Sequence, residues 1–305
     1  MKQKPTNYGD DSCVLCQNQE VVQVYPAGVA QEGRIVKCVP CGLMFVSPQC
    51  RVELQDYREH GADENAGWEL SPSSIERQLN QVSDYKEALA KCVEAAPGGR
   101  VLEVGCCTGT LLNELQNCGM SCVGLEPNGF AARYGRAKYG LDIRTETLEE
   151  SSLEEASFDV VLFLHVIEHV TDPKVTLQAI RRILKPGGLL VVETPRYDTV
   201  TFKAFGKHER NIVDNWHLYF FSRDSLKQML VASGFNVVGD LVPGRTVTFS
   251  RLVGGLGKAL RWRFLEAIGQ WLAKSKVNSF LSFRLNLRDI YRVYAVPGED
   301  VQDVE

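Results

Sequence analysis

Short apolar runs alternate with amphipathic stretches between residues 100 and 195, and this alternation restricts the possible folds more than any other feature of the chain. Each run is short enough for a buried strand, while each amphipathic stretch repeats its apolar positions at helical spacing. The runs lie at 101–104, 121–126, 158–166 and 187–195, and the helical stretches at 111–116, 130–138 and 175–184. Strands in strict alternation with helices form βαβ units, so we expect an α/β fold that is Rossmann-like and doubly wound, with a mostly parallel sheet.

Further elements flank this core on both sides. A helical pattern at 73–94 ends at a Pro-Gly-Gly breaker, and another helix begins at the N-cap residue Ser222 and stops at Gly234. Strand patterns follow at 235–242 and 288–297. We divide the chain into four parts: a cysteine-rich module at 1–50, a linker and helix at 51–95, the core at 96–245, and a basic helical segment, last strand and acidic tail at 246–305.

Two Cys-x-x-Cys pairs lie in the N-terminal module. Cys13 and Cys16 are separated by 21 residues from Cys38 and Cys41, which is close to the spacing of four-thiolate zinc ribbons. Each pair forms a tight knuckle that presents two thiolates, and a tetrahedral Zn²⁺ needs two such knuckles. We therefore predict a structural zinc site, because a closed set of four cysteines leaves no coordination position for water.

The net charge and the first residues of the chain restrict which binding partners and which cellular compartment we expect. The formal net charge of −4 provides no cationic field for nucleic acid, so we expect no nucleic-acid partner. The first residues lack the apolar stretch of a signal peptide, and no apolar run reaches the length of a spanning helix. We expect a cytoplasmic protein whose ten cysteines are reduced.

A tight turn follows the first core strand and suits a ligand that lies against the backbone. It contains Gly105, Cys107 and Gly109. A dinucleotide fingerprint Gly-x-Gly-x-x-Gly that begins at Gly105 fails at two positions, 107 and 110. The pattern acidic-x-Gly-x-Gly-x-Gly, with Glu103 as its acid, fails only at Cys107.

On these residues the chain resembles the class I methyltransferases that use S-adenosylmethionine (SAM), over roughly 95–245. The resemblance implies that SAM binds at Glu103, Gly105, Cys107 and Gly109. A carboxylate is favourable beside SAM, which carries a sulfonium and an amino group and no phosphate. Glu126 lies 21 residues after Gly105, at the end of the second strand, where an acid accepts the ribose hydroxyls.

The resemblance adds two residues to the expected cofactor site and accounts for a histidine motif after the fourth strand. It places Thr147, in the turn after the third strand, beside the adenine, and Leu164 at the cofactor end of the fourth strand. The stretch His165-Val-Ile-Glu168-His169 matches an inverted zinc-protease pattern. We reject that hydrolase interpretation because His165 directly ends a strand, whereas a zinc pair at this spacing needs both histidines on one helix face. The family has a closely similar motif at the exit of strand four.

His217 is the main catalytic candidate. It lies after the fifth strand and before the helix at Ser222, a region that carries acceptor-binding residues in this family. A histidine near neutral pH can remove a proton from a hydroxyl or an acidic carbon as the methyl group arrives. His165 is the second polar group expected at the acceptor, because ligands of open α/β sheets bind at the carboxyl ends of the strands. Packing within an aromatic cluster is the alternative role for His217.

The segment 251–288 carries eight Lys and Arg residues against one acid, Glu266, among several aromatic residues. Such a segment can lie on an anionic membrane surface as a peripheral contact. The alternative, which we favour, is a helical cap over the acceptor pocket.

We expect transfer of a methyl group from SAM to an oxygen or an acidic carbon of a small, sugar-like acceptor. The N-terminal cysteine pairs and the histidine before the helix at Ser222 are similar to those of zinc-ribbon methyltransferases that act on nucleotide-linked deoxysugars. One alternative is a ubiquinone-type aromatic O-methyltransferase, whose strand-four motif is shared. The other is a non-catalytic module that binds SAM or a nucleotide.

Overall fold

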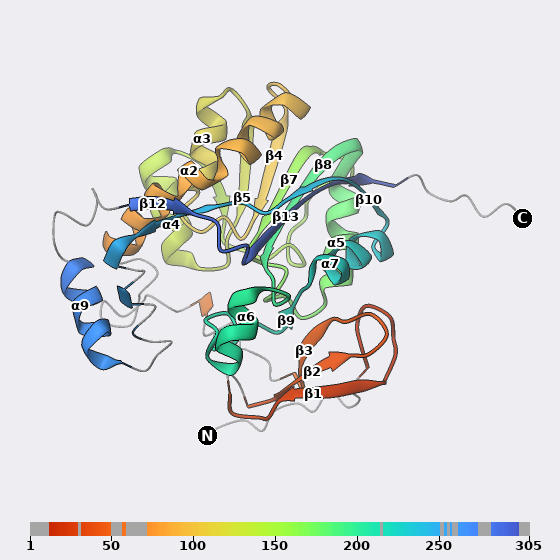
Figure 1. The fold of residues 1–305 in the computed structure, drawn as a ribbon. Coiled ribbons are helices and arrows are strands. Elements are labelled where there is room, and N and C mark those ends of the chain that lie inside the picture. Colours follow the sequence, from red (N-terminus) through yellow and green to blue (C-terminus); the bar gives the residue numbers. More distant parts are fainter. Residues whose placement is uncertain are drawn as a thin grey trace, which may run out of the picture.

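A seven-stranded sheet forms the centre of the computed structural model, with strand order β10-β13-β8-β7-β4-β5-β6 (Figure 1). The structure describes residues 12–29, 32–49, 57–58, 72–213, 216–250, 253–254, 257, 262–273 and 282–298. The strands are β4 Arg100–Val104, β5 Ser121–Leu125, β6 Asp142–Arg144, β7 Phe158–Leu164, β8 Leu184–Pro195, β10 Phe235–Leu241 and β13 Ile290–Pro297. β13 is antiparallel to both β8 and β10, and the other neighbouring strands pair in parallel, so the mostly parallel α/β sheet predicted from the sequence is confirmed.

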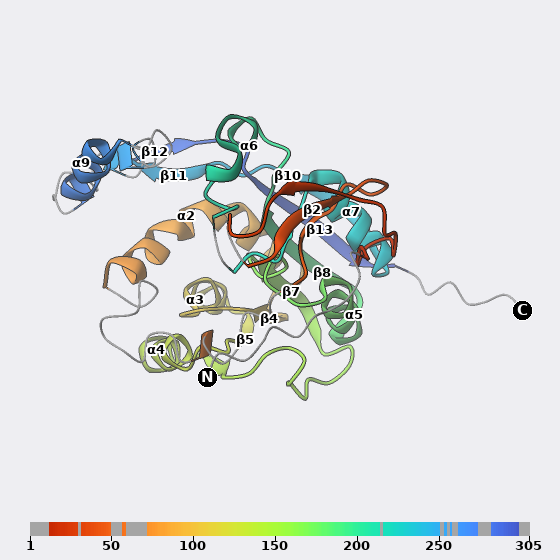
Figure 2. The ribbon, with the colours of Figure 1, turned by 90° about the horizontal axis from the view of Figure 1, so that it is seen from below.

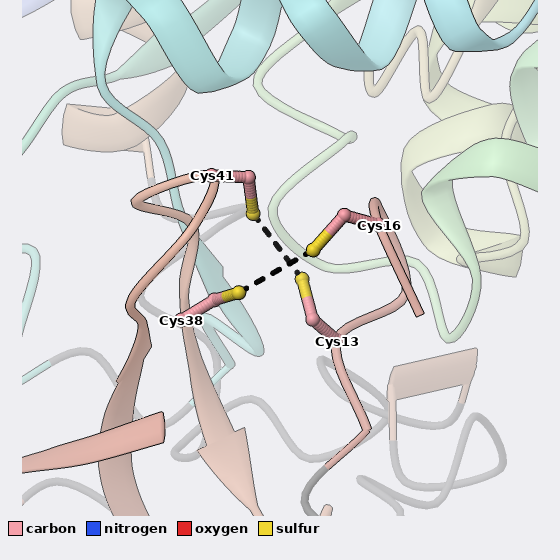
Figure 3. Close-up of side chains that lie close together, drawn as sticks. All are labelled: Cys13, Cys16, Cys38 and Cys41. Carbon is pink, nitrogen blue, oxygen red and sulfur yellow. Dashed lines mark hydrogen bonds between the residues drawn. The ribbon is translucent and has the colours of Figure 1, made fainter. Parts of the chain in front are cut away.

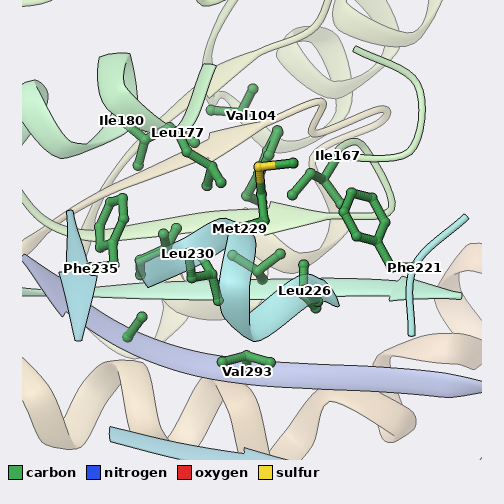
Figure 4. Packing of buried hydrophobic residues seen from close by; sticks show 14 of the residues in the cluster. Val104, Ile167, Leu177, Ile180, Phe221, Leu226, Met229, Leu230, Phe235 and Val293 are labelled. Carbon is green, nitrogen blue, oxygen red and sulfur yellow. The ribbon is translucent and has the colours of Figure 1, made fainter. Parts of the chain in front are cut away.

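Helices cover both faces of this sheet, as Figure 2 shows. One face carries α2 (Pro72–Ala95), α3 (Thr110–Asn117) and α4 (Gly129–Tyr139), and the other carries α5 (Pro173–Ile183) and α7 (Arg223–Ala232). The helices predicted at 73–94, 111–116, 130–138, 175–184 and after Ser222 are present. Ser222 caps α7 as expected, through a capping box with Ser225. Figure 4 shows the apolar side of α7, with Leu226, Met229 and Leu230, packed on the sheet at Val293.

The last predicted strand belongs to the core sheet. β13 inserts between β8 and β10, with Val293 opposite Val192 and Tyr294 opposite Val191. Its first six residues are buried, which explains its near-continuous apolar sequence. The chain therefore returns from the segment after 246 to complete the core.

The cysteine-rich module is a small antiparallel sheet, and one strand from the core pairs with its edge. It consists of β1 (Val21–Tyr25), β2 (Arg34–Cys38) and β3 (Met44–Ser47), and β9 (Tyr219–Phe220) from the core pairs with β3. The hydroxyl of Tyr197 also donates to the carbonyl of Gly42 at 2.5 Å. These contacts attach the module to the chain segment that contains His217.

The segments at 196–221 and 246–288 contain elements that periodicity did not reveal. The first contains α6 (Val200–Phe205) and a 3₁₀ turn, Gly206–His208, before β9. In the second, α9 (Arg263–Ala273) agrees with the helical prediction, but Ser282–Leu285 forms a strand, β12, which pairs with β11 (Arg245–Thr248). The helical prediction is therefore wrong at 282–285, because a cross-strand partner decided the conformation. Among the described residues no helix has the length and apolar character needed to cross a membrane.

Candidate active site

The four predicted metal ligands converge in the N-terminal module (Figure 3). Their Sγ atoms lie within 4.8 Å of one another, with Cys13 to Cys41 and Cys16 to Cys38 each at 3.4 Å. Four sulfurs about 2.3 Å from a tetrahedral Zn²⁺ would be about 3.8 Å apart, so the cluster fits this ion. Burial raises the pKa of Cys13 to about 11, and a dication at the centre would supply the charge that favours its thiolate.

The turn after β4 uses left-handed backbone at three of the predicted cofactor residues. Gly105, Cys107 and Gly109 have φ values of 73°, 49° and 70°. Glycine adopts this region without strain, which explains the family's preference for glycine at position 107, whereas a cysteine there is costly. A Cβ added to Gly105 would lie 2.5 Å from Cγ2 of Val166, so the turn packs directly against the exit of β7.

Glu126 ties this turn to the end of β5. Its carboxylate accepts hydrogen bonds from the backbone N–H groups of Cys107 and Asn128, both at 2.8 Å. The hydroxyl of Tyr57 donates to the same carboxylate at 3.2 Å. Sequence reasoning missed Tyr57, because it lies in a polar stretch that has no periodic pattern. Glu126, the predicted ribose ligand, therefore connects the turn after β4, the start of α4 and Tyr57.

Glu103 provides the test of whether this site fits SAM. It is 5% exposed, and its Oε2 atom accepts no hydrogen bond from the residues that the structure describes. Burial, and secondly the nearby charge of Glu126, raise the pKa of Glu103 to about 8. A buried carboxylate beside a second acid favours a cationic ligand, so the donor set fits the sulfonium and amino groups of SAM.

The other two predicted cofactor residues lie at the same edge of the sheet. Leu164 is the last residue of β7 and is buried. Thr147 lies in the turn after β6, where its N–H donates to Glu150 at 3.0 Å and its hydroxyl accepts from the N–H of Glu150 at 3.3 Å. Glu150 also pairs with Arg58, the neighbour of Tyr57. The linker before α2 therefore contacts this side of the site at two points.

His165 follows β7 with a left-handed φ of 56° and lies among acids. Its Nε2 is 3.0 Å from Glu193, and its Nδ1 is 3.5 Å from Glu168. Glu193 is itself paired in the core with Arg292, at 2.6 Å. The sequence analysis missed Glu193, although a carboxylate at the end of the apolar run of β8 was a visible signal. These contacts orient the imidazole at the carboxyl edge of the sheet.

His217 lies on the wall of a small pocket that Glu168 and Phe220 also line. It is 6% exposed, and its Nδ1 lies 2.8 Å from the carbonyl oxygen of Asn211. Its ring centroid is 4.8 Å from that of His169 and 6.2 Å from that of Phe220. The structure therefore brings His217 and His165 to either side of one buried acid, Glu168, whose pKa both histidines lower.

The comparisons with known proteins agree with this geometry. A family model described as a methyltransferase domain matches residues 54–239. The chain is 39% identical over 113 residues to a ubiquinone biosynthesis O-methyltransferase of Bradyrhizobium sp., covering 35% of this chain and 44% of that protein. It is 40% identical over 102 residues to the enzyme of the same name from Cereibacter sphaeroides, covering 32% and 41%. The chain thus spans less than half the length of these relatives.

Solved structures share the fold at low sequence identity. The YcgJ protein from Bacillus subtilis superposes with a TM-score of 0.51 at 14% identity, covering 72% of this chain and 99% of that one. This likeness supports the architecture of the core.

Proposed function

The chain belongs to the methyltransferase-domain family, and from this premise we propose that it transfers a methyl group from SAM to an oxygen or an acidic carbon of a small acceptor. The observation that carries this proposal is the buried carboxylate of Glu103 beside Glu126 and the left-handed turn, with one oxygen that accepts no hydrogen bond from the described residues. When bound, SAM supplies an electrophilic methyl group. Glu103 would hold its cationic part, Glu126 its ribose and Thr147 its adenine, with Leu164 as a further cofactor contact.

The acceptor would lie in the pocket beside Glu168 and His217. We assign the general base to His217: a carbonyl only accepts hydrogen bonds, so Asn211 fixes the proton of His217 on Nδ1 and leaves the lone pair on Nε2. His165 would be the second polar group, held by Glu193. Since methyl transfer needs an aligned acceptor more than acid or base strength, most of the rate enhancement would come from positioning.

Two acceptor classes remain as proposals. An aromatic hydroxyl compound is favoured by the ring-bearing pocket wall, with Tyr197, Phe202 and Phe220, and by the name of the curated relatives. A sugar-like, nucleotide-linked acceptor is the second. Mass spectrometry of molecules that co-purify with the protein, followed by methylation assays on a panel of both classes, separates them. Absence of SAM binding in calorimetry would instead favour a non-catalytic module.

The four cysteines are proposed to bind one structural Zn²⁺. None of the nine cysteines that the structure describes forms a disulfide. This fits a reducing compartment, and we propose a cytoplasmic location.

Replacing Glu126 with alanine is expected to weaken SAM binding by about 2–4 kcal/mol, or roughly 30- to 900-fold, because charge-assisted hydrogen bonds are lost. Part of this loss would come from the turn, since the backbone N–H of Cys107 also loses its acceptor. Isothermal titration calorimetry with SAM measures the effect. Glu154→Ala, which removes an exposed carboxylate elsewhere, should bind like the wild type. Unchanged affinity in Glu126→Ala would refute the assignment.

We propose a peripheral contact with anionic membranes through α9. Trp262, Phe264, Ile268 and Trp271 are exposed on or beside this helix, and the surrounding sequence is strongly basic. Aromatic and aliphatic side chains flanked by Lys and Arg suit the boundary of an anionic bilayer. All the described residues that line the pocket come from 168–220. None of them comes from α9, so α9 contributes no described residue to this pocket as a cap. Most of the basic residues of 251–288 lie outside the described part of the chain.

The double variant F264E/W271E is expected to reduce binding to phosphatidylglycerol vesicles about tenfold or more, because two large apolar side chains no longer enter the lipid. Co-sedimentation with vesicles measures this. Val200→Glu, at an exposed apolar residue of α6, is the matched control and should bind normally. Equal vesicle binding by the wild type, the double variant and the control would contradict the membrane contact and favour the cap hypothesis for α9.

A further inference from the structure

A second set of metal-ligand side chains lies apart from the four cysteines. Glu168, His169 and His217 each offer one ligand atom, and these atoms lie within 4.8 Å of one another. They come from two chain segments, the exit of β7 and the residues before β9. The carbonyl of Glu168 accepts hydrogen bonds from the N–H groups of Leu218, at 2.8 Å, and Tyr219, at 3.2 Å, so the backbone itself fixes the two segments together.

Both imidazoles are oriented by backbone carbonyls. Nδ1 of His169 lies 2.8 Å from the carbonyl oxygen of Trp216, and Nδ1 of His217 lies 2.8 Å from that of Asn211. Since these oxygens can only accept, each Nδ1 carries the proton and each Nε2 carries the lone pair that a metal requires. Metal-binding histidines in proteins are commonly held in this way, with the second nitrogen donating to a carbonyl.

The carboxylate of Glu168 supplies the third, anionic ligand. It is 2% exposed, and its Oε2 accepts from the hydroxyl of Thr194 at 2.9 Å. Its Oε1 accepts no hydrogen bond from the described residues, with His165 Nδ1 3.5 Å away. A buried carboxylate oxygen that accepts no hydrogen bond from the described residues favours a cation.

We propose that Glu168, His169 and His217 bind one divalent transition-metal ion, for which two imidazoles and a carboxylate make Zn²⁺ the best match. Three protein ligands leave a coordination position open, and both Glu168 and His217 line the pocket, so a water or an acceptor oxygen could occupy it. His165 does not belong to this set of three. The site goes beyond methyl transfer and does not require it. Nε2 of His217 cannot bind a cation and accept a proton together, so His217 would act as the base only in the metal-free protein.

Zinc stoichiometry tests this proposal without SAM or an acceptor. Untagged protein, loaded with Zn²⁺ and freed of excess by gel filtration, is expected to hold two ions per chain by mass spectrometry. Glu168→Gln and His169→Ala should each hold one, the ion of the four cysteines. His208→Ala, which removes an exposed histidine elsewhere, and His165→Ala should both retain two. One ion in the wild type, or two in both ligand variants, would overturn the site.

Cobalt spectra of the wild-type protein test the site without any variant, so a variant that fails to fold cannot affect the result. Wild-type protein loaded with Co²⁺ should show the intense near-ultraviolet sulfur-to-cobalt bands of the cysteine site and, at the second equivalent, weak visible bands without added sulfur character. Visible bands that stop growing after one equivalent would contradict the proposal. SAM affinity of the same samples reports separately on the proposed methyltransferase function, which can fail while the metal site stands.

Discussion

Replacing Cys38 with serine is expected to remove the zinc of the four-cysteine cluster and to unfold the N-terminal module. Structural zinc provides about 10–16 kcal/mol of apparent binding free energy in zinc-finger peptides, and this is folding free energy for a unit with so small a core. In the described part of the module, the regular structure is three short strands. Zinc content should fall by one ion per chain, and the amide protons of β1 to β3 should lose their protection from exchange.

The effect of Cys38→Ser should extend to the acceptor side of the core. β3 pairs with β9, and the N–H of Val46 donates to the carbonyl of Leu218 at 3.0 Å, next to His217. SAM affinity should change little, because Glu103 and Glu126 belong to the core sheet. Cys118→Ser, at an exposed cysteine after α3, is the matched control and should keep its zinc and its protection. Unaltered zinc content in Cys38→Ser would show that the assignment is wrong.

His217→Ala is expected to lower turnover by about 10²–10⁴-fold while SAM affinity is unchanged, because removal of a general base affects the transition state and leaves the cofactor site intact. The wild-type rate should fall at acidic pH, where a protonated imidazole cannot accept a proton. Single-turnover assays with an identified acceptor measure the rate, and calorimetry measures SAM binding.

Two controls sharpen the His217 experiment. His208→Ala removes a histidine that lies outside the pocket lining, and its turnover should equal that of the wild type. Assays after dialysis against a chelator too weak to strip a four-thiolate zinc site keep the proposed second cation out of the comparison. Near-wild-type turnover in His217→Ala would leave positioning as the mechanism and return this residue to the aromatic cluster with Phe220.

Local sequence patterns carried much of the fold and part of the site. Apolar periodicity and caps such as Ser222 act between residues a few positions apart, so they can be read directly from the chain. The cysteine pairs and the turn at Gly105 are equally local, and the structure brings the four sulfurs together and places left-handed backbone at that turn. Glu126 was predicted as a cofactor residue because parallel strands end at one edge of the sheet.

Only the tertiary structure decided which distant segments meet. β13 enters the sheet beside β8, β12 becomes a strand through β11, and β9 joins the cysteine module. The same holds for His217, which reaches Glu168 and His169 across some fifty residues of chain. A motif shows that histidines and an acid are present, but the direction of each side chain depends on backbone hydrogen bonds and packing between segments far apart. Local periodicity contains no record of those contacts. The sequence was therefore sufficient to reject a metal pair at 165 and 169, but it could not show that 168, 169 and 217 lie together.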